Sequence, residues 1–347
     1  MNDRGRLRRK AVTIHDVATR AETSIGTVSH VMSGKAPVAP TTRDRVMRAA
    51  DELGYRPNRV ARSLILQQTH MIGMVVPDIA NPFFAELAAA VENTARARDY
   101  CVVLGGVEND PERESIYIAE LLERGVDGLL LAVTADSAAL GRVLGDHPAV
   151  AIDRVPSGWS ASSVTTDDRQ ALRLAVEHVV ELNHQRIGFL GGDERLPLAR
   201  GRRASWREAM QGHRLAPVWE DAGPFTMESG ESAGERLMAL PPSEAPTAVV
   251  AANDLLALGL LRAAQRRGVR VPEDLSIIGY DDIPYAELSM PALTTVAQPI
   301  RSVGQRATTL LLDLMNAETT NARALQLAPW VVVRQSTGPA PRTLRTR

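Results

Sequence analysis

The sequence predicts a small all-α head followed by a large α/β body, in which parallel sheets form two doubly wound subdomains. The head is indicated by three short helical patterns within residues 13–54. The body is indicated by short apolar runs that alternate with amphipathic stretches from residue 70 onward. Because single cores rarely grow beyond about 250–300 residues, we expect this long body to divide into two subdomains.

The composition is that of an ordinary globular protein, with 44% hydrophobic and 23% charged residues in a chain of 347. No stretch approaches the ~18 consecutive apolar residues that a membrane-spanning helix needs. The first ten residues are charged and no apolar run follows them, so we expect no secretory signal and a cytoplasmic protein. The single cysteine, Cys101, excludes a disulfide framework and a multi-cysteine metal site.

Charge is distributed unevenly along the chain. Residues 1–62 hold 13 Lys and Arg against 6 Asp and Glu, whereas the remaining 285 residues hold 27 against 35. A basic head on an acidic body suggests a module that binds a polyanion, because Lys and Arg displace counterions from phosphates. The alternative is a solubilising segment, which charge alone does not exclude.

The helical patterns of the head carry start and stop signals. Thr13, with Asp16 three residues later, has the spacing of a capping box. Thr41 with Asp44 is expected to open the third helix in the same way, and Gly54 is suited to end it in a left-handed conformation.

The first two helices are joined by about four residues, which is the geometry of a helix-turn-helix. Ser24 is suited to cap the second helix, and the apolar stripe of that helix leaves Thr27, Ser29 and His30 facing away from the core. Three small helices alone would fit any tiny bundle. The basic charge and the polar outer face favour DNA, with the second helix in the major groove.

The body reads as alternating strands and helices. The expected strands are residues 72–77, 100–104, 128–133, 149–152, 187–190, 248–251, 276–279 and 293–296. Helices are expected over residues 84–98, 111–124, 170–182 and 254–267. Continuous apolar strands of this kind are typical of parallel sheets covered on both faces.

Polar residues follow the expected strands at their carboxyl ends, where open parallel sheets bind ligands. They are Asp78, Asn81, Asp153, Arg154, Asn253, Asp254, Asp281 and Asp282. Carboxylates, amides and an arginine at one cleft suit a hydroxyl-rich ligand such as a sugar. Each Asp or Asn also fits a plain helix cap, and we expect only that role for Asp168 and Asp254.

The head resembles the DNA-binding domain of the LacI/GalR family of repressors over TIHDVATRAETSIGTVSHVMSGKAPVAPTTRDRVMRAADELGYRPNRVARSL. The resemblance implies that the start of the second helix reads base edges. The implied contacts to DNA are Thr13, Ser24, Ile25, Gly26, Thr27, Ser29, His30 and Thr42.

Three residues of the head depart from the family pattern. Glu22 stands in the turn where the family has glycine, so either Glu22 adopts a left-handed conformation or the turn differs. His30 replaces an arginine, which grips guanine with two hydrogen bonds, and Gly26 has no side chain to read a base. We therefore expect an unusual operator, with His30 as either a weak reader or a spectator.

The resemblance implies a hinge helix after the head, within residues 58–69. A helix this short is marginal in water and needs support from DNA or from a second copy. The implied DNA contacts here are Asn58, Arg59, Ala61 and Leu64. Leu64 matches a leucine wedged into the minor groove; covering the next domain is the alternative role.

The body is similar to the effector-binding core that the family shares with periplasmic sugar-binding proteins of type I. Segments that carry the resemblance include VVPDIANPFF, AIDRVP, PTAVVAANDLLALG and LSIIGYDD. It implies a pocket between subdomains lined by Phe83 or Phe84, Asp153, Arg202, Phe225, Asn253, Asp281 and Gln298. Asn183 stands where the family prefers glycine, which is harmless because asparagine tolerates the left-handed region.

The sequence also bears on two other classes of protein, an esterase and a periplasmic solute-binding protein. Residues 230–234 fit the G-x-S-x-G pattern of an esterase nucleophile, but no buried strand is expected before them and a helix continues after them. No P-loop, zinc-type HExxH or dinucleotide fingerprint occurs, so we expect no enzyme, cofactor or metal. A periplasmic solute-binding protein would share the body but has no use for the basic head.

The sequence therefore predicts a homodimeric repressor of carbohydrate genes, released from a pseudo-palindromic DNA operator by a sugar-type effector. A co-repressed regulator with a nucleobase or nucleoside ligand is the alternative. The expected parts are a disordered basic arm (residues 1–10), the helix-turn-helix domain (11–57), the hinge and linker (58–69), the effector-binding and dimerisation core (70–337) and a disordered tail (338–347).

Overall fold

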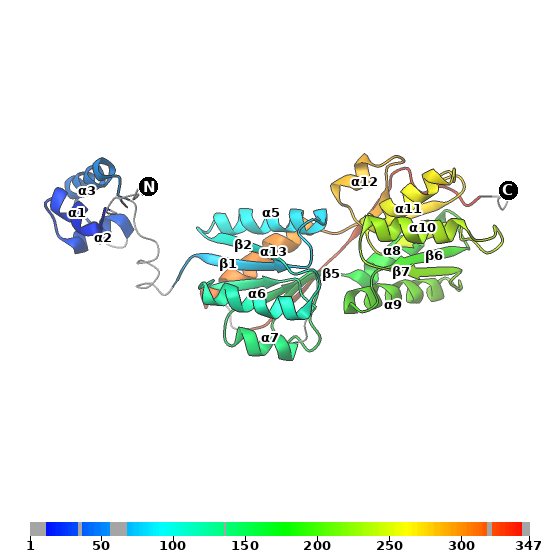
Figure 1. Cartoon of the computed structure of the whole chain (residues 1–347), viewed down its shortest axis with the longest axis horizontal. Helices are drawn as coiled ribbons and strands as arrows, with labels where there is room; N and C mark the ends of the chain where they lie inside the picture. Colours follow the sequence, from blue (N-terminus) through cyan, green and yellow to red (C-terminus); the bar gives the residue numbers. More distant parts are fainter. Residues whose placement is uncertain (1–11, 34–36, 56–67, 135–136, 318–320, 342–347) are drawn as a thin grey trace, which may run out of the picture. The chain divides into compact units, whose positions relative to one another are not determined.

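The computed structural model describes residues 12–33, 37–55, 68–134, 137–317 and 321–341 (Figure 1). The chain divides into two compact units, residues 1–69 and 70–347, which are described separately below. The expected basic arm and most of the expected hinge lie outside the described residues. Among the helices that the structure describes, none has the length and apolar character needed to cross a bilayer.

The head consists of helices α1 (Ile14–Arg20), α2 (Ile25–Ser33) and α3 (Pro40–Leu53) around one small apolar core. The capping box is confirmed, since the backbone N–H of Thr13 donates to the carboxylate of Asp16 at 2.8 Å. Ser24 caps α2 as expected, because its Oγ accepts from the N–H of Thr27 at 3.1 Å.

The start of α3 corrects our expectation. The helix begins at Pro40, and no side chain caps it, so Thr41 and Asp44 do not form a capping box. Proline suits the first helical position because its φ is already helical and its missing N–H has no partner there anyway. Gly54 ends α3 with a φ of 64°, as expected. Glu22 has a φ of 49°, so of the two alternatives that the sequence left open, the structure shows the left-handed conformation.

The body holds two six-stranded sheets. The first has the order β11-β5-β4-β3-β1-β2 and the second β12-β10-β9-β8-β6-β7. All strand pairs are parallel except β12, which runs antiparallel to β10. The strands of the first sheet are β1 (Met71–Val76), β2 (Cys101–Gly106), β3 (Gly128–Leu131), β4 (Ala149–Ile152), β5 (Ser162–Thr166) and β11 (Ala324–Leu327). Those of the second are β6 (Ile187–Gly191), β7 (Trp219–Ala222), β8 (Ala248–Ala251), β9 (Ser276–Asp281), β10 (Thr294–Ala297) and β12 (Trp330–Val332).

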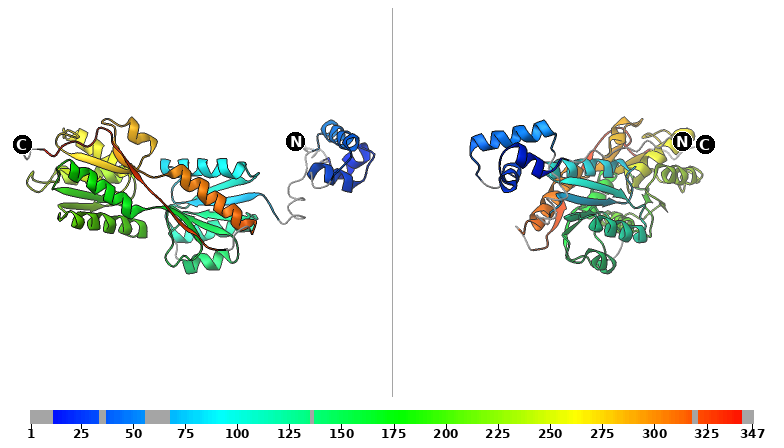
Figure 2. Two further views of the ribbon diagram at one scale, coloured as in Figure 1. Left: turned by 180° about the vertical axis from the view of Figure 1, so that it is seen from behind. Right: turned by 60° about the vertical axis from the view of Figure 1, so that its left-hand side comes forward.

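Helices cover both sheets, as the doubly wound prediction requires. The first subdomain has α5 (Pro82–Arg96), α6 (Pro111–Glu123), α7 (Ser137–Leu144) and α13 (Ile300–Met315). The second has α8 (Asp168–Glu181), α9 (Pro197–Gly212), α10 (Met227–Met238), α11 (Asp254–Arg266) and α12 (Pro284–Leu288). In Figure 2, α13 lies beside α5 although the two helices are far apart in sequence.

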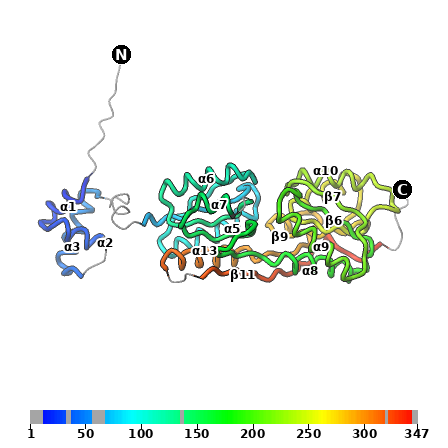
Figure 3. The backbone as a smooth tube through the Cα atoms, turned by 90° about the horizontal axis from the view of Figure 1, so that it is seen from below, coloured from blue at the N-terminus to red at the C-terminus, as the bar shows by residue number. Residues whose placement is uncertain are grey.

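The chain crosses between the subdomains three times. The crossings run from β5 to α8, from β10 to α13, and from β11 to β12. Figure 3 shows the last of these as the red segment that continues from β11 toward the C-terminal end. A single apolar cluster contains buried side chains of both subdomains, so the two sheets are coupled by packing as well as by the chain.

The eight expected strands are confirmed with ends that shift by at most two residues, and so are the four expected helices. Sequence reasoning missed β5, β7, β11 and β12. The tail is also partly corrected, because Gly338 N donates to Ser276 Oγ at 3.0 Å and Ala340 N donates to the carbonyl of Leu182 at 2.8 Å. Residues 342–347 of the expected disordered tail lie outside the described residues.

The G-x-S-x-G segment lies inside α10 and forms no strand-to-helix turn. Its glycines serve helix packing instead. A Cβ on Gly230 would lie 2.2 Å from the carbonyl oxygen of Leu256 in α11, and one on Gly234 would lie 2.5 Å from the Cβ of Ala263. The middle residue, Ser232, is exposed. The pattern therefore reflects the close approach of two helices.

Gly230→Ala is expected to lower the free energy of unfolding by about 1–3 kcal/mol, because the added methyl group overpacks a contact with backbone. Urea denaturation followed by circular dichroism measures this. The matched control is Gly201→Ala in α9, where an added Cβ meets no atom within 4 Å. That control should be neutral or stabilising by up to about 1 kcal/mol. Equal effects of the two substitutions would contradict the packing explanation.

Candidate functional site

The outer face of α2 gathers the residues expected to contact DNA. Ile25, Gly26, Ser29 and His30 are exposed and Thr27 is half-buried, whereas Val28 and Val31 of the same helix face the core. Ile25, at the start of the helix, is 40% exposed, which is high for an isoleucine. The helix therefore presents a mixed polar and apolar surface of the kind that contacts base edges.

Two hydroxyl groups of the expected set already serve as caps. Thr13 Oγ1 donates to Asp16 Oδ2 at 2.8 Å, and Ser24 Oγ lies 2.9 Å from Thr27 Oγ1. Thr42 lies in the first turn of α3 and is half-buried. Asn58, Arg59, Ala61 and Leu64 lie outside the described residues.

A cavity of about 670 Å³ lies between the two subdomains. We call it the larger cavity, because a second cavity of about 300 Å³, the smaller cavity, shares part of its lining. The volume of the larger cavity is in the range of small-molecule sites. The first subdomain contributes Pro77, Asp78, Asn81, Phe84, Glu108, Asn109, Asp110, Pro111, Thr134 and Arg154. The second contributes Asp193, Arg195, Leu196, Pro197, Pro224, Phe225 and Thr226. Several of these follow the carboxyl ends of strands, which is the edge where we expected a ligand.

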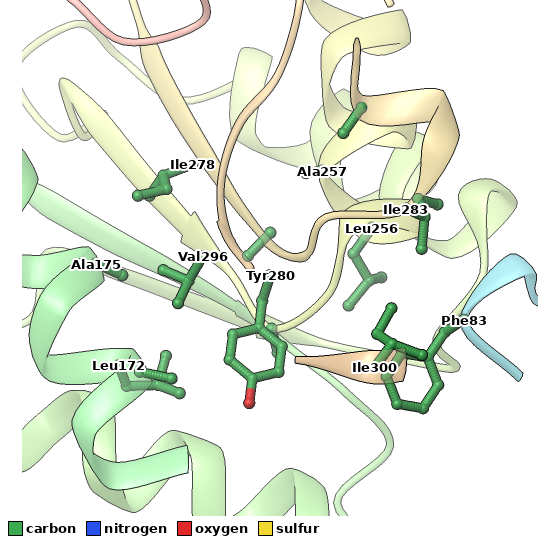
Figure 4. Close-up of a cluster of buried hydrophobic side chains, with 14 of the residues drawn as sticks. Phe83, Leu172, Ala175, Leu256, Ala257, Ile278, Tyr280, Ile283, Val296 and Ile300 are labelled. Atoms are coloured by element: carbon green, nitrogen blue, oxygen red, sulfur yellow. The ribbon is translucent and has the colours of Figure 1, made fainter. Parts of the chain in front are cut away.

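The structure separates the expected effector-binding residues into two groups. Phe84 and Phe225 line the larger cavity, and Asp153 lines a smaller one beside it. Arg202, Asn253, Asp281 and Gln298 are buried and line neither of these cavities. The sequence did not decide whether Phe83 or Phe84 lines the pocket; in the structure Phe84 lines the larger cavity. The ring of Phe83 lies beside Ile300, in the apolar cluster that joins the subdomains (Figure 4).

Arg202 forms the centre of the buried group. Its side chain is 3% exposed, and its Nε donates to Asp168 Oδ1 at 3.1 Å. Its Nη1 donates to the carbonyl of Ala252 at 2.9 Å, and its guanidinium lies 4.1 Å from the centre of the Tyr280 ring. Burial acts to lower the pKa of Arg202, but the neighbouring acidic groups, Asp168 first among them, more than reverse this and raise it, so the cation persists.

Asp168 corrects the expectation that it only caps a helix. The cap of α8 is Asp167, whose carboxylate accepts from Gln170 N, while Asp168 pairs with Arg202. The hydroxyl of Tyr280 also donates to Asp168 Oδ1, at 2.5 Å. Burial, then the charge of Asp168, raises the pKa of Tyr280 and keeps it a neutral donor. Sequence reasoning missed both residues as parts of the site.

Asp281 and Gln298 meet at the ends of β9 and β10. Gln298 Nε2 donates to Asp281 Oδ1 at 2.7 Å. Burial raises the pKa of Asp281 well above its usual range, and the charge of Arg202 opposes this only in part. Asp281 has a φ of 124° and Asp282 a φ of 64°, so the chain turns sharply where β9 ends.

Comparison with known proteins places this geometry in a family. The model of bacterial regulatory proteins of the lacI family matches residues 13–58, and that of the periplasmic binding protein-like domain matches residues 176–337. The catabolite control protein A of Priestia megaterium is 35% identical, with 94% of this chain and 99% of that protein covered. The chain belongs to the LacI family.

This LacI-family chain is accordingly a DNA-binding transcriptional regulator. The HTH-type transcriptional repressor CytR of Escherichia coli K12 is 34% identical over 95% of this chain and 98% of that protein. A crystal structure of the Lac repressor dimer bound to operator and the anti-inducer ONPF superposes with a TM-score of 0.87. It shares 32% identity and covers 95% of this chain and 100% of the repressor chain. The expected head and the expected type I core are both confirmed.

Asp254 is a second correction in this LacI-family core. Asn253 caps α11, with its Oδ1 accepting from Leu256 N at 2.9 Å. Asp254 is fully buried and accepts from Thr295 Oγ1 at 2.6 Å and from Ile283 N at 2.9 Å. It therefore ties α11 to β10 and to the start of α12. Burial raises the pKa of Asp254 to about 7.

This pKa makes the stability of the fold depend on pH. Below pH 4 the carboxyl is protonated in both the folded and the unfolded chain, so its favourable contribution is fully present. As the pH rises toward about 7, only the folded chain retains the proton, and stability falls by up to about 1.4 kcal/mol per pH unit.

Asp254→Asn, which mimics the protonated carboxyl, is expected to remove this slope between pH 4 and pH 7. Urea unfolding of both proteins at several pH values measures it. Asp146→Asn, in the turn between α7 and β4, serves as the control for substitution of an exposed carboxylate. Parallel pH profiles of the wild type and Asp254→Asn would contradict the assignment.

Proposed function

We propose that the chain represses carbohydrate-utilisation genes and that a sugar-type effector releases it from a pseudo-palindromic operator. The observation that carries this proposal is the larger cavity, which is lined by residues of both subdomains, with carboxylate, amide and hydroxyl side chains among them. Carboxylate and amide groups there suit paired hydroxyls, and Phe84 and Phe225 offer apolar faces to a sugar ring. Among similar structures are a CelR–cellobiose complex and an Enterococcus faecium LacI family regulator with bound ribose.

DNA recognition is assigned to the head. Ile25, Gly26 and His30 would face base edges, with Thr13, Ser24, Thr27, Ser29 and Thr42 at bases or phosphates. Two copies of the head on one duplex require a homodimer, because a two-fold operator presents two half-sites. Asn58, Arg59 and Ala61 would hold the hinge on DNA while Leu64 enters the minor groove.

Release would follow from a change in how the two subdomains pack. A ligand that contacts both walls of the larger cavity favours one relative position of the subdomains, through its differential affinity for the two states. The first subdomain continues directly from the linker, so its movement changes the spacing of paired hinges. A coupling of about 1–3 kcal/mol is typical of such a link.

A nucleobase or nucleoside that acts as co-repressor is the second candidate. Phe84 and Phe225 belong to opposite subdomains and both line the larger cavity, so a planar ring between them fits as well. Titration of sugars and nucleosides against a complex of the full chain with a duplex selected from random DNA separates the two candidates. Sugars should weaken the complex, whereas a nucleobase co-repressor should strengthen it.

Arg202→Ala is expected to abolish the response to effector while the affinity for the selected duplex stays within about threefold. Loss of the guanidinium leaves Asp168, which lines the smaller cavity, and Tyr280 without their shared partner. Fluorescence anisotropy with labelled duplex, with and without effector, measures both quantities. Arg270→Ala, at an exposed ion pair with Asp274, is the control and should respond normally. A normal response by Arg202→Ala would refute the assignment.

His30→Arg is expected to change base preference at one position of each half-site toward guanine. Arginine donates two parallel hydrogen bonds to guanine, a discrimination of about 1–3 kcal/mol that histidine does not supply. Selection from random duplexes by the wild type and by the variant compares the two. Arg20→Gln, which removes an exposed pair with Glu52 away from the start of α2, serves as control. An unchanged preference would make His30 a spectator.

A further inference from the structure

The smaller cavity, about 300 Å³, lies beside the larger one. The two share four lining residues, Thr134, Arg154, Leu196 and Pro197, which therefore form the boundary between them. Segments that follow β3, β4 and β5 meet the starts of α8 and α9 at this cavity. It is thus built at the carboxyl ends of three neighbouring strands, as ligand sites in parallel sheets are.

Two buried polar side chains at this cavity have atoms without a hydrogen-bond partner in the described part of the chain. These atoms are Arg154 Nε and Thr166 Oγ1. Arg154 is 8% exposed and Thr166 is 6% exposed. Arg154 uses Nη1 to donate to Asn109 Oδ1, and its Nε makes no hydrogen bond but lies in an ion pair, 3.4 Å from Asp153 Oδ2. Buried donors left unpaired are costly, so their presence points to a bound group.

The N-terminus of α9 adds backbone donors to the same place. This helix spans Pro197–Gly212, and no side chain caps it at Leu196. The first N–H groups of a helix have no partner inside the helix, and the helix dipole makes this end electropositive. Pro197 has no N–H, and the N–H of Leu196 donates to the carbonyl of Asp193, so the donors at this end are the N–H groups of Leu198 and Ala199. Leu196, Pro197 and Leu198 all line the smaller cavity. The neighbouring helix α8 is unlike it, because Asp167 caps that helix.

The carboxylates around the cavity are already engaged. Asp168 accepts from Arg202 and from Tyr280, and Asp167 accepts from Gln170 N. Asp153 is paired with Arg154, and burial raises the pKa of Asp153. The groups left over are therefore donors: a guanidinium N–H, a hydroxyl and the first N–H groups of α9.

We propose that the smaller cavity binds an oxyanion, a phosphate or carboxylate group of the effector, while the rest of the effector occupies the larger cavity. An oxyanion has enough lone pairs for all these donors, and negative charge is favoured at a helix N-terminus next to an arginine. The effector of this chain is then an acidic sugar derivative. The inference rests on the effector-binding role proposed above.

The test measures binding of inorganic phosphate and of acetate to the full chain by isothermal titration, against chloride at equal ionic strength. The wild type should bind at least one of the two anions saturably. Thr166→Val should weaken this binding about tenfold, which is the usual value of one hydrogen bond to a charged group. Without anion, the thermal midpoint of Thr166→Val should equal or exceed that of the wild type, because no described group pairs with this hydroxyl.

The matched control is Thr308→Val, a fully buried threonine of α13 whose hydroxyl donates to the carbonyl of Gly304. It should leave anion binding unchanged. Arg154→Gln is a second variant and should abolish the binding that Thr166→Val weakens. Anion sites on the basic head are the same in all these proteins, so only the differences between variants count.

Absence of saturable binding of either anion to the wild type would overturn the proposal, as would unchanged binding in both Thr166→Val and Arg154→Gln. Binding of phosphate alone or of acetate alone identifies which group the effector carries. Affinity for the selected duplex is measured in the same samples. A wild type that binds an anion at this cavity but shows no duplex preference would refute the proposed repressor function and leave the anion site standing.

Discussion

Three elements of the second subdomain are joined by one buried cation, Arg202. A guanidinium removed from water is tolerated only if it is paired, and removal of one partner of such a pair typically costs about 3–5 kcal/mol. The partners of Arg202 come from the start of α8, the end of β8 and the end of β9. Arg202 of α9 therefore holds together the start of α8 and the carboxyl ends of β8 and β9.

The same arrangement explains how the two subdomains communicate. The chain crosses between the sheets three times, and one of these crossings leads from β5 directly into Asp168, the partner of Arg202. The apolar cluster continues from Phe83 of α5 to Leu256 and Ile283 of the second subdomain (Figure 4). Close-packed interiors change by discrete rearrangement more than by gradual deformation, so these packed side chains are the route by which the proposed change in subdomain packing would be transmitted.

Sequence patterns predicted the strands and helices whose buried positions hold apolar residues. The strand β5 was missed because its sequence, SSVTT, is mostly hydroxyl-bearing, although all five residues are buried. The edge strands β7, β11 and β12 were missed because they are only partly buried. The choice between the neighbours Asp167 and Asp168 as helix cap was beyond the sequence, since both positions fit. Only the fold shows that Tyr280 and Arg202 lie close enough to donate hydrogen bonds to Asp168.

The charge of the cleft depends on how burial shifts the pKa values of its carboxyl groups, and not only on how many carboxyl groups there are. Asp153, Asp254 and Asp281 all have raised pKa values, whereas Arg202 stays cationic. A raised pKa favours the neutral form of a carboxyl, which repels an acidic ligand less than an ionised carboxylate does and can both donate and accept hydrogen bonds. On the function proposed above, the larger cavity would take the polyol part of the effector, and Arg154 with the N-terminus of α9 would take an acidic group attached to it. The two parts of the effector would then be bound by different walls of the cleft.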